Sequence, residues 1–250
     1  MHLSIVIPAY NEQARLPATL EAAVRFLEGE SYDSEIWVVD DGSADRTAAI
    51  AESVTSSIPV RVLRREHAGK GAAVRAGMLE ATGTYRFLCD ADLSMPFEEL
   101  PRFLAEADRG ADVIVGSRQV AGARRENERW YRHLMGRVFN GVVRLLTVRG
   151  IHDTQCGYKL FRGDLVGELF EPLSVEGFAF DVEVLFAAQR AGYRLVEIPI
   201  IWRQNELTRV SPVRHSIEMF GQVVRLRARA WAGCYPRRSR RLPEARRENS

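Results

Sequence analysis

The chain has 250 residues, of which 46% are hydrophobic and 27% are charged, and its formal net charge at pH 7 is only +2. This composition suits one large α/β core or at most two small ones, and the nearly balanced charge gives no reason to expect nucleic acid as a partner. The three scattered cysteines fit a reducing compartment rather than a zinc site. No apolar run approaches the roughly 20 residues that span a bilayer.

Apolar strands alternate with helical segments in the first half of the chain. Strands are expected at 3–8, 35–40, 59–64, 85–90 and 111–116, with helices at 13–29, 45–55, 69–81 and 97–109 between them. This alternation predicts a mostly parallel sheet with helices on both faces. Beyond it we expect helices at 129–148, 178–191 and 212–232, irregular or strand structure at 151–162, and a strand at 195–200.

Two carboxylates follow the fourth expected strand, in the motif Asp90-Ala91-Asp92. Ligands of α/β sheets bind outside the carboxyl ends of the strands. Hard oxygen ligands suit Mg²⁺ or Mn²⁺ on a substrate diphosphate. Asp90 and Asp92 are therefore candidate metal ligands, although Asp-x-Asp also occurs in many surface turns.

The first two strands also end in polar residues, Pro8-Ala9-Tyr10-Asn11-Glu12 and Asp40-Asp41-Gly42-Ser43. Helix capping and turns explain some of them, Asp41 or Ser43 above all. Three polar strand ends in one βαβ series nevertheless indicate a binding edge. Tyr10 could stack on a base or pack against the sheet edge, and Glu12 could orient a base or ribose or face water.

Lys70 lies in a Gly69-Lys70-Gly71 turn at the start of an expected helix. The glycines allow close backbone approach, and a helix N-terminus favours anions, so we predict a phosphate contact for Lys70. The turn is not a Walker A loop, because the upstream glycine spacing is absent.

As an ordered set, these motifs resemble the family 2 glycosyltransferases, which have a Rossmann-like GT-A fold. Gly116-Ser117-Arg118 and Asp153-Thr154-Gln155-Cys156-Gly157-Tyr158-Lys159 narrow the resemblance to the dolichyl-phosphate (polyprenyl-phosphate) β-glucosyltransferases, with mannosyltransferases as neighbours. The resemblance runs from about residue 3 to residue 202. Mannosyl-type relatives often carry Gln where this chain has Ser94, and Arg209 stands near the place of a lysine in relatives.

The resemblance implies a nucleotide-sugar site and an acceptor site. The residues expected to bind the nucleotide sugar are Pro8, Tyr10, Glu12, Asp40, Lys70, Asp90 and Ala91. The catalytic set would be Asp92, Arg118, Arg132 and Asp181. The two arginines would hold the acceptor phosphate by bidentate hydrogen bonds. Asp181 would position substrate or brace Arg118, and Asp153 could brace its own loop or contact substrate.

The implied activity is inverting transfer of glucose from UDP-glucose to a polyprenyl phosphate, by one metal-assisted displacement. The alternatives are a GDP-mannose donor, a metal-dependent nucleotidyltransferase and an inactive nucleotide-sugar-binding module. The catalytic domain is expected at 1–211, with an amphipathic insertion near 129–148, an interfacial helix at 212–235 and a basic, disordered tail at 236–250.

A peripheral position on the cytoplasmic face of a membrane is also expected. The first residues form a strand rather than a signal peptide. The two arginine-rich helices carry tryptophan and apolar residues at helical spacing, which suits an interface, and the tail would attract anionic lipids.

Overall fold

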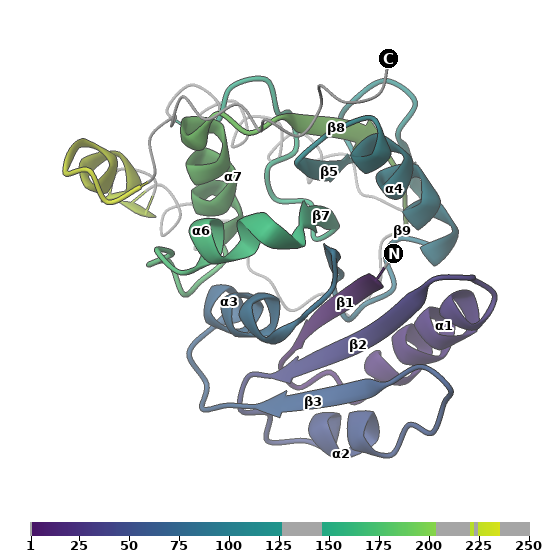
Figure 1. The fold of residues 1–250 in the computed structure, drawn as a ribbon. Helices are drawn as coiled ribbons and strands as arrows, with labels where there is room; N and C mark the ends of the chain where they lie inside the picture. The colour runs from purple at the N-terminus through teal and green to yellow at the C-terminus, as the bar shows by residue number, and fades with distance from the viewer. Residues whose placement is uncertain (1, 127–146, 204–220, 223–224, 236–250) are drawn as a thin grey trace.

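A seven-stranded sheet forms the centre of the computed structural model, which describes residues 2–126, 147–203, 221–222 and 225–235 (Figure 1). Its strands are β1 His2–Ala9, β2 Asp33–Asp40, β3 Val60–Arg64, β4 Tyr85–Leu88, β5 Val113–Ser117, β7 Lys159–Arg162 and β8 Leu195–Pro199. They lie side by side in the order β3-β2-β1-β4-β7-β5-β8. β7 is antiparallel to both neighbours and the other pairs are parallel, so the mostly parallel sheet predicted from the sequence is confirmed.

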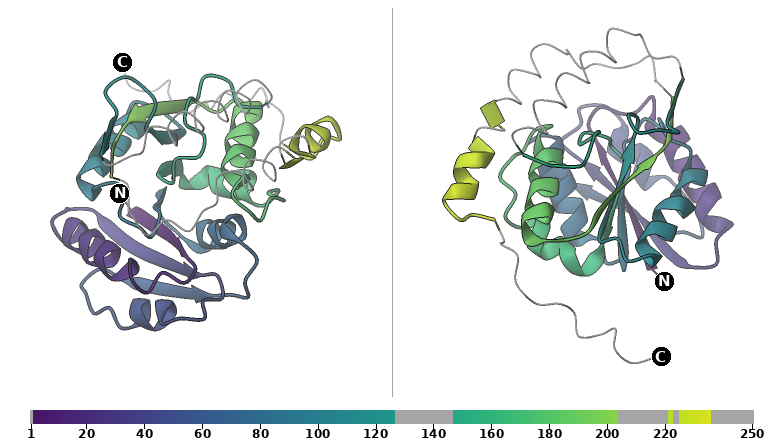
Figure 2. Two further views of the ribbon diagram at one scale, coloured as in Figure 1. Left: turned by 180° about the vertical axis from the view of Figure 1, so that it is seen from behind. Right: turned by 90° about the horizontal axis from the view of Figure 1, so that it is seen from above.

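Helices cover both faces of this sheet, as the view from above in Figure 2 shows. Their bounds are α1 Leu16–Glu28, α2 Thr47–Glu52, α3 Lys70–Glu80, α4 Leu100–Asp108, α6 Val166–Phe170 and α7 Phe180–Ala191, with short 3-10 turns at Phe97–Glu99 and Gly163–Leu165. α1, α2 and α4 pack on one face, and α3, α6 and α7 pack on the other. The predicted α/β class is therefore confirmed.

Burial alternates along the central strands, which explains why the helices can cover both faces. Ile5 and Ile7 of β1 belong to the core under α1 and α4, whereas Val6 between them belongs to the core under α3 and α7. In β2, Val38 and Val39 divide in the same way. Successive side chains of a strand point to opposite faces, and β-branched residues suit a pleated surface that is buried on both sides.

Several strand ends meet at one edge of the sheet. Ala9 at the end of β1 pairs with Asp40 at the end of β2, and Val6 of β1 pairs with Leu88 at the end of β4. Because β7 runs the other way, its first residue, Lys159, pairs with both Leu88 and Val115 of β5. The loop that precedes β7 therefore reaches the same edge as the loops that follow β1, β2, β4 and β5.

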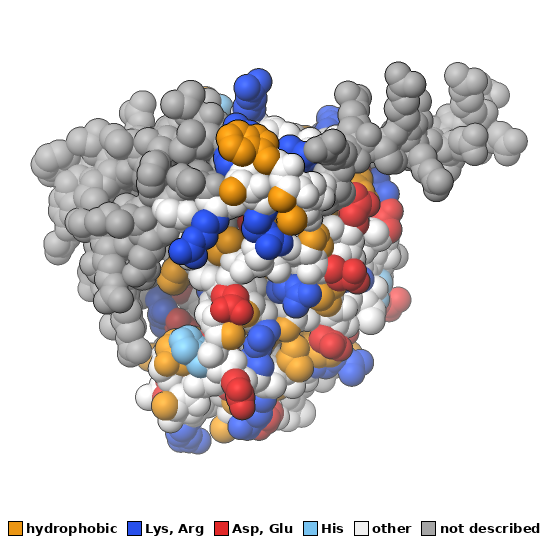
Figure 3. Space-filling view, turned by 90° about the vertical axis from the view of Figure 1, so that its left-hand side faces the viewer, with side chains coloured by type: hydrophobic (Ala, Val, Ile, Leu, Met, Phe, Trp, Pro, Cys, Tyr) orange, Lys and Arg blue, Asp and Glu red, His pale blue; other side chains and the backbone are white. Residues whose placement is uncertain are grey.

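Figure 3 views the molecule from the side to which the arrowheads of β2 and β3 point in Figure 1. On the described part of this face, lysine and arginine side chains are interspersed with aspartate and glutamate side chains. The visible surface thus has the same near balance of charge as the whole chain, whose net charge is +2.

The end of the chain adds a helical segment at 225–231 that packs beside α7. Leu226 and Ala230 are buried in the core under α7, whereas Trp231 is 81% exposed. A short pair of parallel strands, β6 Arg124–Glu126 and β9 Ile201–Arg203, lies outside the main sheet. Within the described residues, no helix is both long enough and apolar enough to cross a membrane.

Some expectations fall outside the described residues. They are Arg132 and most of the helix near 129–148, Arg209, most of the first half of the helix at 212–232, and the tail at 236–250.

Candidate active site

The turn after β1 is held by side chains from the loop after β2. The backbone N–H of Asn11 donates to Ser43 Oγ at 2.9 Å, and the N–H of Glu12 donates to Thr47 Oγ1 at 2.7 Å. Asn11 has a φ of 54°, which asparagine adopts more readily than most residues. The carboxylate of Glu12 accepts a hydrogen bond from Arg15 Nε at 2.6 Å, so this side chain pairs with a neighbour in the same turn.

Asp41 fixes the loop that leads from β3 to α3. Its carboxylate accepts the backbone N–H groups of Ala68 at 3.1 Å and Gly69 at 2.8 Å, and His67 Nδ1 lies 2.8 Å from Asp41 Oδ2. Capping was expected to explain Asp41 or Ser43, and the structure shows that Asp41 holds a distant loop. Asp40 is also buried, and its Oδ1 accepts the N–H of Ser43 at 3.4 Å.

The ring of Tyr10 stacks on the ring of His67, with 4.1 Å between their centroids. Tyr10 remains 45% exposed, so it is not packed into the sheet edge, which was one of its two expected roles. A half-exposed aromatic face near the ends of β1 and β2 can still receive a planar base.

The two glycines beside Lys70 let a second loop dock on the start of α3. Gly69 has a φ of 110°, and a Cβ there would lie 2.6 Å from the carbonyl oxygen of Glu176. A Cβ at Gly71 would lie 2.4 Å from the carbonyl oxygen of Val175. The N–H of Gly71 donates to the Glu176 carbonyl at 2.7 Å. A protein carbonyl therefore accepts the Gly71 N–H at the start of α3, and the phosphate contact of the Lys70 side chain stays a prediction.

The Lys70 side chain turns instead towards the carboxylates after β4. Its Nζ lies 2.6 Å from Asp90 Oδ1. Burial opposes ionisation of Asp90, but the charge and hydrogen bond of Lys70, together with the charges of Lys159 and Arg118, hold the pKa of Asp90 below its ordinary value. Burial, and next the charge of Asp90, raise the pKa of Asp92, whose Oδ1 accepts the N–H of Ser94 at 3.1 Å.

These carboxylates fit a divalent metal as far as their donor chemistry goes. Asp90 and Asp92 offer hard oxygens at a strand end, and a Cβ at Gly157 would lie only 1.9 Å from Asp90 Oδ2. Glycine at this place in the signature loop therefore leaves room for the Asp90 carboxylate. The described residues hold no cluster of three or more His, Cys, Asp or Glu side chains that could bind a metal. Donor phosphates and water would have to complete the coordination.

Arg118, after β5, is held by a buried carboxylate. Its Nε lies 2.7 Å from Asp153 Oδ2 and its Nη2 lies 2.9 Å from Asp153 Oδ1. Burial opposes ionisation of Asp153, but the Arg118 guanidinium holds its pKa below the ordinary value. Glu197 of β8 accepts the N–H of Asp153 at 2.8 Å and thereby anchors the loop. Asp153, which was expected to brace its own loop or contact substrate, thus braces Arg118.

Asp181, at the start of α7, has a different partner. Its Oδ1 lies 2.6 Å from the Nζ of Lys159, a residue with no exposed surface. Burial raises the pKa of Asp181, and Lys159 and then Lys70 offset part of that effect. Asp181 therefore stands within the electrostatic field of Lys70 but is engaged in a buried ion pair. It does not fill the bracing role at Arg118 that we considered for it.

Glu183, two residues later on the same helix, makes a connection that sequence reasoning missed. Its carboxylate accepts the Val175 N–H at 2.8 Å and the Ser174 Oγ–H at 2.9 Å, and it also accepts the hydroxyl of Tyr235. Burial raises the pKa of Tyr235 to about 12, and the bond to Glu183 adds to that shift. Glu183 thus ties the 174–177 loop, which docks on α3, to the end of the described chain.

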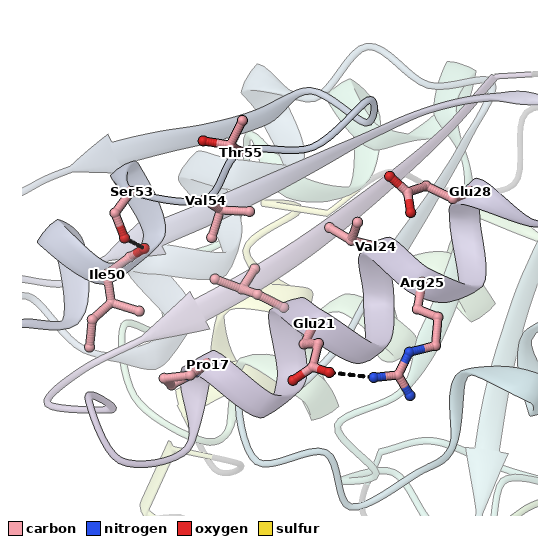
Figure 4. Close-up of a pocket in the computed structure, with 10 residues that line it drawn as sticks. Pro17, Glu21, Val24, Arg25, Glu28, Ile50, Ser53, Val54 and Thr55 are labelled. Atoms are coloured by element: carbon pink, nitrogen blue, oxygen red, sulfur yellow. Dashed lines mark hydrogen bonds and ion pairs between the residues drawn. The ribbon is translucent and has the colours of Figure 1, made fainter.

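A surface groove between α1 and α2 lies apart from these groups (Figure 4). Its lining includes Pro17 and Val24 from α1 and Ile50 from α2, and the ion pair of Glu21 and Arg25 lies along it. It contains none of the strand-end residues described above, so we do not assign the active site there.

Comparison with known proteins was made against this geometry. Residues 4–170, more than half of the chain, match the model of glycosyl transferase family 2. The chain is 34% identical over 252 residues to the dolichyl-phosphate beta-glucosyltransferase of Dictyostelium discoideum, covering 94% of this chain and 76% of that protein. It is 32% identical to the Homo sapiens protein of the same name, covering 99% and 80%.

Solved structures agree on the fold. Glucosyl-3-phosphoglycerate synthase from Mycobacterium tuberculosis in complex with uridine diphosphate superposes with a TM-score of 0.67 at 20% identity, covering 90% of this chain and 79% of that one. The same enzyme holding Mn²⁺, UDP-glucose and phosphoglyceric acid gives a TM-score of 0.67 at 18% identity, covering 93% and 79%. The strand order, the family match and the curated relatives together show that the chain belongs to glycosyl transferase family 2, with the GT-A fold.

Proposed function

We propose that the protein transfers glucose from UDP-glucose to the phosphate of a polyprenyl lipid, with inversion at the anomeric carbon. The carrying observation is that anion-binding and metal-binding groups converge at one edge of the sheet. Lys70 contacts Asp90, and Arg118 lies close enough to help lower the pKa of Asp90. The dolichyl-phosphate beta-glucosyltransferases among the relatives support this choice of donor sugar and acceptor.

The donor would bind at the ends of β1, β2 and β4. Tyr10 offers an aromatic face to the base, and the buried carboxylate of Asp40 is placed to accept a hydrogen bond from the nucleoside. Pro8 near the end of β1, together with Ala91 and Glu12 in the segments after β4 and β1, would shape this subsite. Asp90 and Asp92 would hold Mg²⁺ or Mn²⁺, which would neutralise charge on the departing diphosphate.

The acceptor would bind beside Arg118. Its guanidinium is fixed in direction by Asp153 and packs 5.4 Å from the ring centroid of Trp202. A guanidinium held in this way has a fixed direction and would bind phosphate oxygens without first losing side-chain freedom. We keep Arg132 as a second phosphate ligand on the sequence pattern alone. Most of the rate would come from positioning and charge stabilisation.

No general base is needed for this reaction. A phosphate monoester loses its second proton near about pH 6, so its oxygen is already ionised at neutral pH. Asp181 is the one carboxylate of our catalytic set on α7, and it is buried in a pair with Lys159. We assign it a role in positioning, through Lys159 and the field at Lys70, rather than a role in proton transfer.

A panel of nucleotide sugars with a short polyprenyl phosphate tests the proposal, with lipid products identified by mass. We expect a glucosylated lipid and free UDP from UDP-glucose. Product from GDP-mannose alone would favour the mannosyl alternative. Release of inorganic diphosphate would favour a nucleotidyltransferase, and no lipid product from any donor would favour an inactive binding module.

We further propose that the protein works as a peripheral protein at the cytoplasmic face of a membrane. Trp231 is 81% exposed on a helical segment that also carries Arg225, Arg227 and Arg229. An exposed tryptophan among arginines suits a lipid interface. The whole chain should sediment with anionic liposomes at low salt, and Trp231→Ser should weaken this binding even at high salt. A chain that stays in the supernatant at low salt would exclude the assignment.

A further inference from the structure

Lys70 pairs with a carboxylate that the proposed reaction needs for its metal. The Nζ of Lys70 lies 2.6 Å from Asp90 Oδ1, which is buried, whereas 28% of the Asp90 side chain as a whole is exposed. A divalent cation that binds Asp90 therefore shares this carboxylate with the ammonium of Lys70, which already neutralises its charge. Two cations on one carboxylate repel each other strongly at such distances.

The backbone at Lys70 is fixed, whereas 21% of its side chain is exposed. Gly69 and Gly71 are wedged against the carbonyls of Glu176 and Val175, so the turn itself cannot shift easily. The four-carbon side chain of lysine is flexible, and the Lys70 Nζ lies 5.9 Å from the ring centroid of the 40% exposed Phe178. An exchange of partners requires a fixed backbone and an ammonium group that can move.

We propose that Lys70 is an exchangeable counter-ion for Asp90, a role that rests on the proposed function. Without donor, Lys70 neutralises Asp90 and weakens the hold of Asp90 and Asp92 on a divalent cation. The diphosphate of the donor draws the ammonium away from Asp90 and onto a phosphate oxygen. Asp90 is then open to the metal, so the metal and the donor bind as a pair, and the free protein keeps little metal.

The test measures Mn²⁺ binding rather than turnover, by titration calorimetry or by the electron paramagnetic resonance signal of free Mn²⁺. Lys70→Met should bind Mn²⁺ about tenfold or more tightly than the unaltered protein when no nucleotide is present, because a unit charge in direct contact has been removed. With saturating UDP, the variant should show no such gain. Lys70→Gln serves as a second variant, and circular dichroism checks that both fold.

Arg15→Gln is the matched control. Arg15 also lies in the field of Asp92 and Asp90, but its hydrogen bond goes to Glu12. If only the general loss of positive charge matters, Mn²⁺ binding should tighten to a similar extent in Arg15→Gln and Lys70→Met. That result would overturn the exchange. Weaker Mn²⁺ binding by both Lys70 variants would also overturn it, because Lys70 would then support the metal site.

The two proposals fail in different ways. If Lys70→Met gains no Mn²⁺ affinity while the unaltered protein still makes glucosylated lipid, only the exchange is wrong. If the unaltered protein binds no Mn²⁺ even with UDP, the metal assignment is wrong and the exchange is wrong with it.

Discussion

The donor side and the acceptor side of the proposed site are built in different ways. On the donor side, the turn after β1 is held by backbone N–H groups that donate to the short side chains of Ser43 and Thr47. On the acceptor side, Arg118 is held by a buried charge, Asp153, whose own loop is anchored by Glu197.

The two sides should differ in how well they tolerate the loss of a single interaction. Hydrogen bonds in turns are individually worth about 1 kcal/mol, and loss of one leaves the others in place. When one partner of a buried ion pair is removed, the other remains as an uncompensated charge, which lowers the free energy of unfolding by about 3–5 kcal/mol. The donor side should therefore lose catalysis without losing the fold, whereas the acceptor side should lose both together.

The largest expected effect is on the donor side, from Asp92→Asn. Removing a charge from a metal site with few protein ligands should cost at least about several kcal/mol of transition-state stabilisation, so transfer should fall to background. The Asp92 side chain lies at a strand end, so thermal unfolding of the variant should stay close to that of the unaltered protein. Near-normal transfer, or transfer without added divalent metal, would rule out this role.

Asp153→Asn tests the acceptor side. It removes a buried partner of Arg118 and should lower the free energy of unfolding by about 3–5 kcal/mol. Asp164→Asn is the control, because Asp164 pairs with Arg162 while 62% of its side chain is exposed, and the loss there should stay below about 1 kcal/mol. Urea unfolding measures both. Equal losses would contradict the contrast between the two sides.

The same pair predicts a pH dependence. The folded pKa of Asp153 is lowered by Arg118, so the stability that its carboxylate contributes is fully present above its unfolded value of about 3.9. That contribution is lost as the pH falls further, through the folded pKa. The gap in unfolding free energy between the unaltered protein and Asp153→Asn should therefore narrow below about pH 4.

Asp181 and Lys159 separate a structural role from a catalytic one. Asp181→Asn leaves Lys159 buried without its partner and should destabilise the fold. Adding Lys159→Met should recover part of that stability. Loss of a general base slows a reaction by a factor of about 10²–10⁴. In the double variant, the single-turnover rate should fall by less than about a hundredfold. Collapse to background would indicate a hydroxyl acceptor that needs Asp181 as a base.

The smallest expected effect comes from Tyr235→Phe, which removes one of several donors to the buried Glu183. We expect a loss of about 1–3 kcal/mol in unfolding free energy, with transfer changed little. Tyr193→Phe is the matched control, since its hydroxyl bonds Glu168 at an exposed position, and its loss should be smaller. If the two variants lose equal stability, Glu183 does not anchor the segment that carries Tyr235.

The sequence predicted the donor side better than the acceptor side, for a physical reason. Asp90 and Asp92 directly follow an apolar strand, so a local pattern places them at the sheet edge. The partner of Arg118 lies 35 residues away in a loop, and the partner of Glu183 lies 52 residues away. Asp181 was the residue considered as a brace for Arg118, and no local pattern in the sequence pointed to Asp153 in that role.

The neighbour of the turn at the start of α3 could not be predicted, for a similar reason. The Gly69-Lys70-Gly71 turn indicates close backbone approach, but the sequence does not say what approaches. The structure shows that it is the carbonyl of Glu176, more than 100 residues away. The signal from the glycines was sound, and only the identity of the neighbour was missed.

The most direct test of this division is the binding of UDP with Mn²⁺ to Arg118→Ala, measured by calorimetry beside its transfer rate. Arg118 belongs to the acceptor side, so binding of UDP should stay within about twofold of the unaltered protein while transfer to polyprenyl phosphate is lost. Loss of UDP binding in a folded Arg118→Ala protein would contradict the account, because Arg118 would then belong to the donor side.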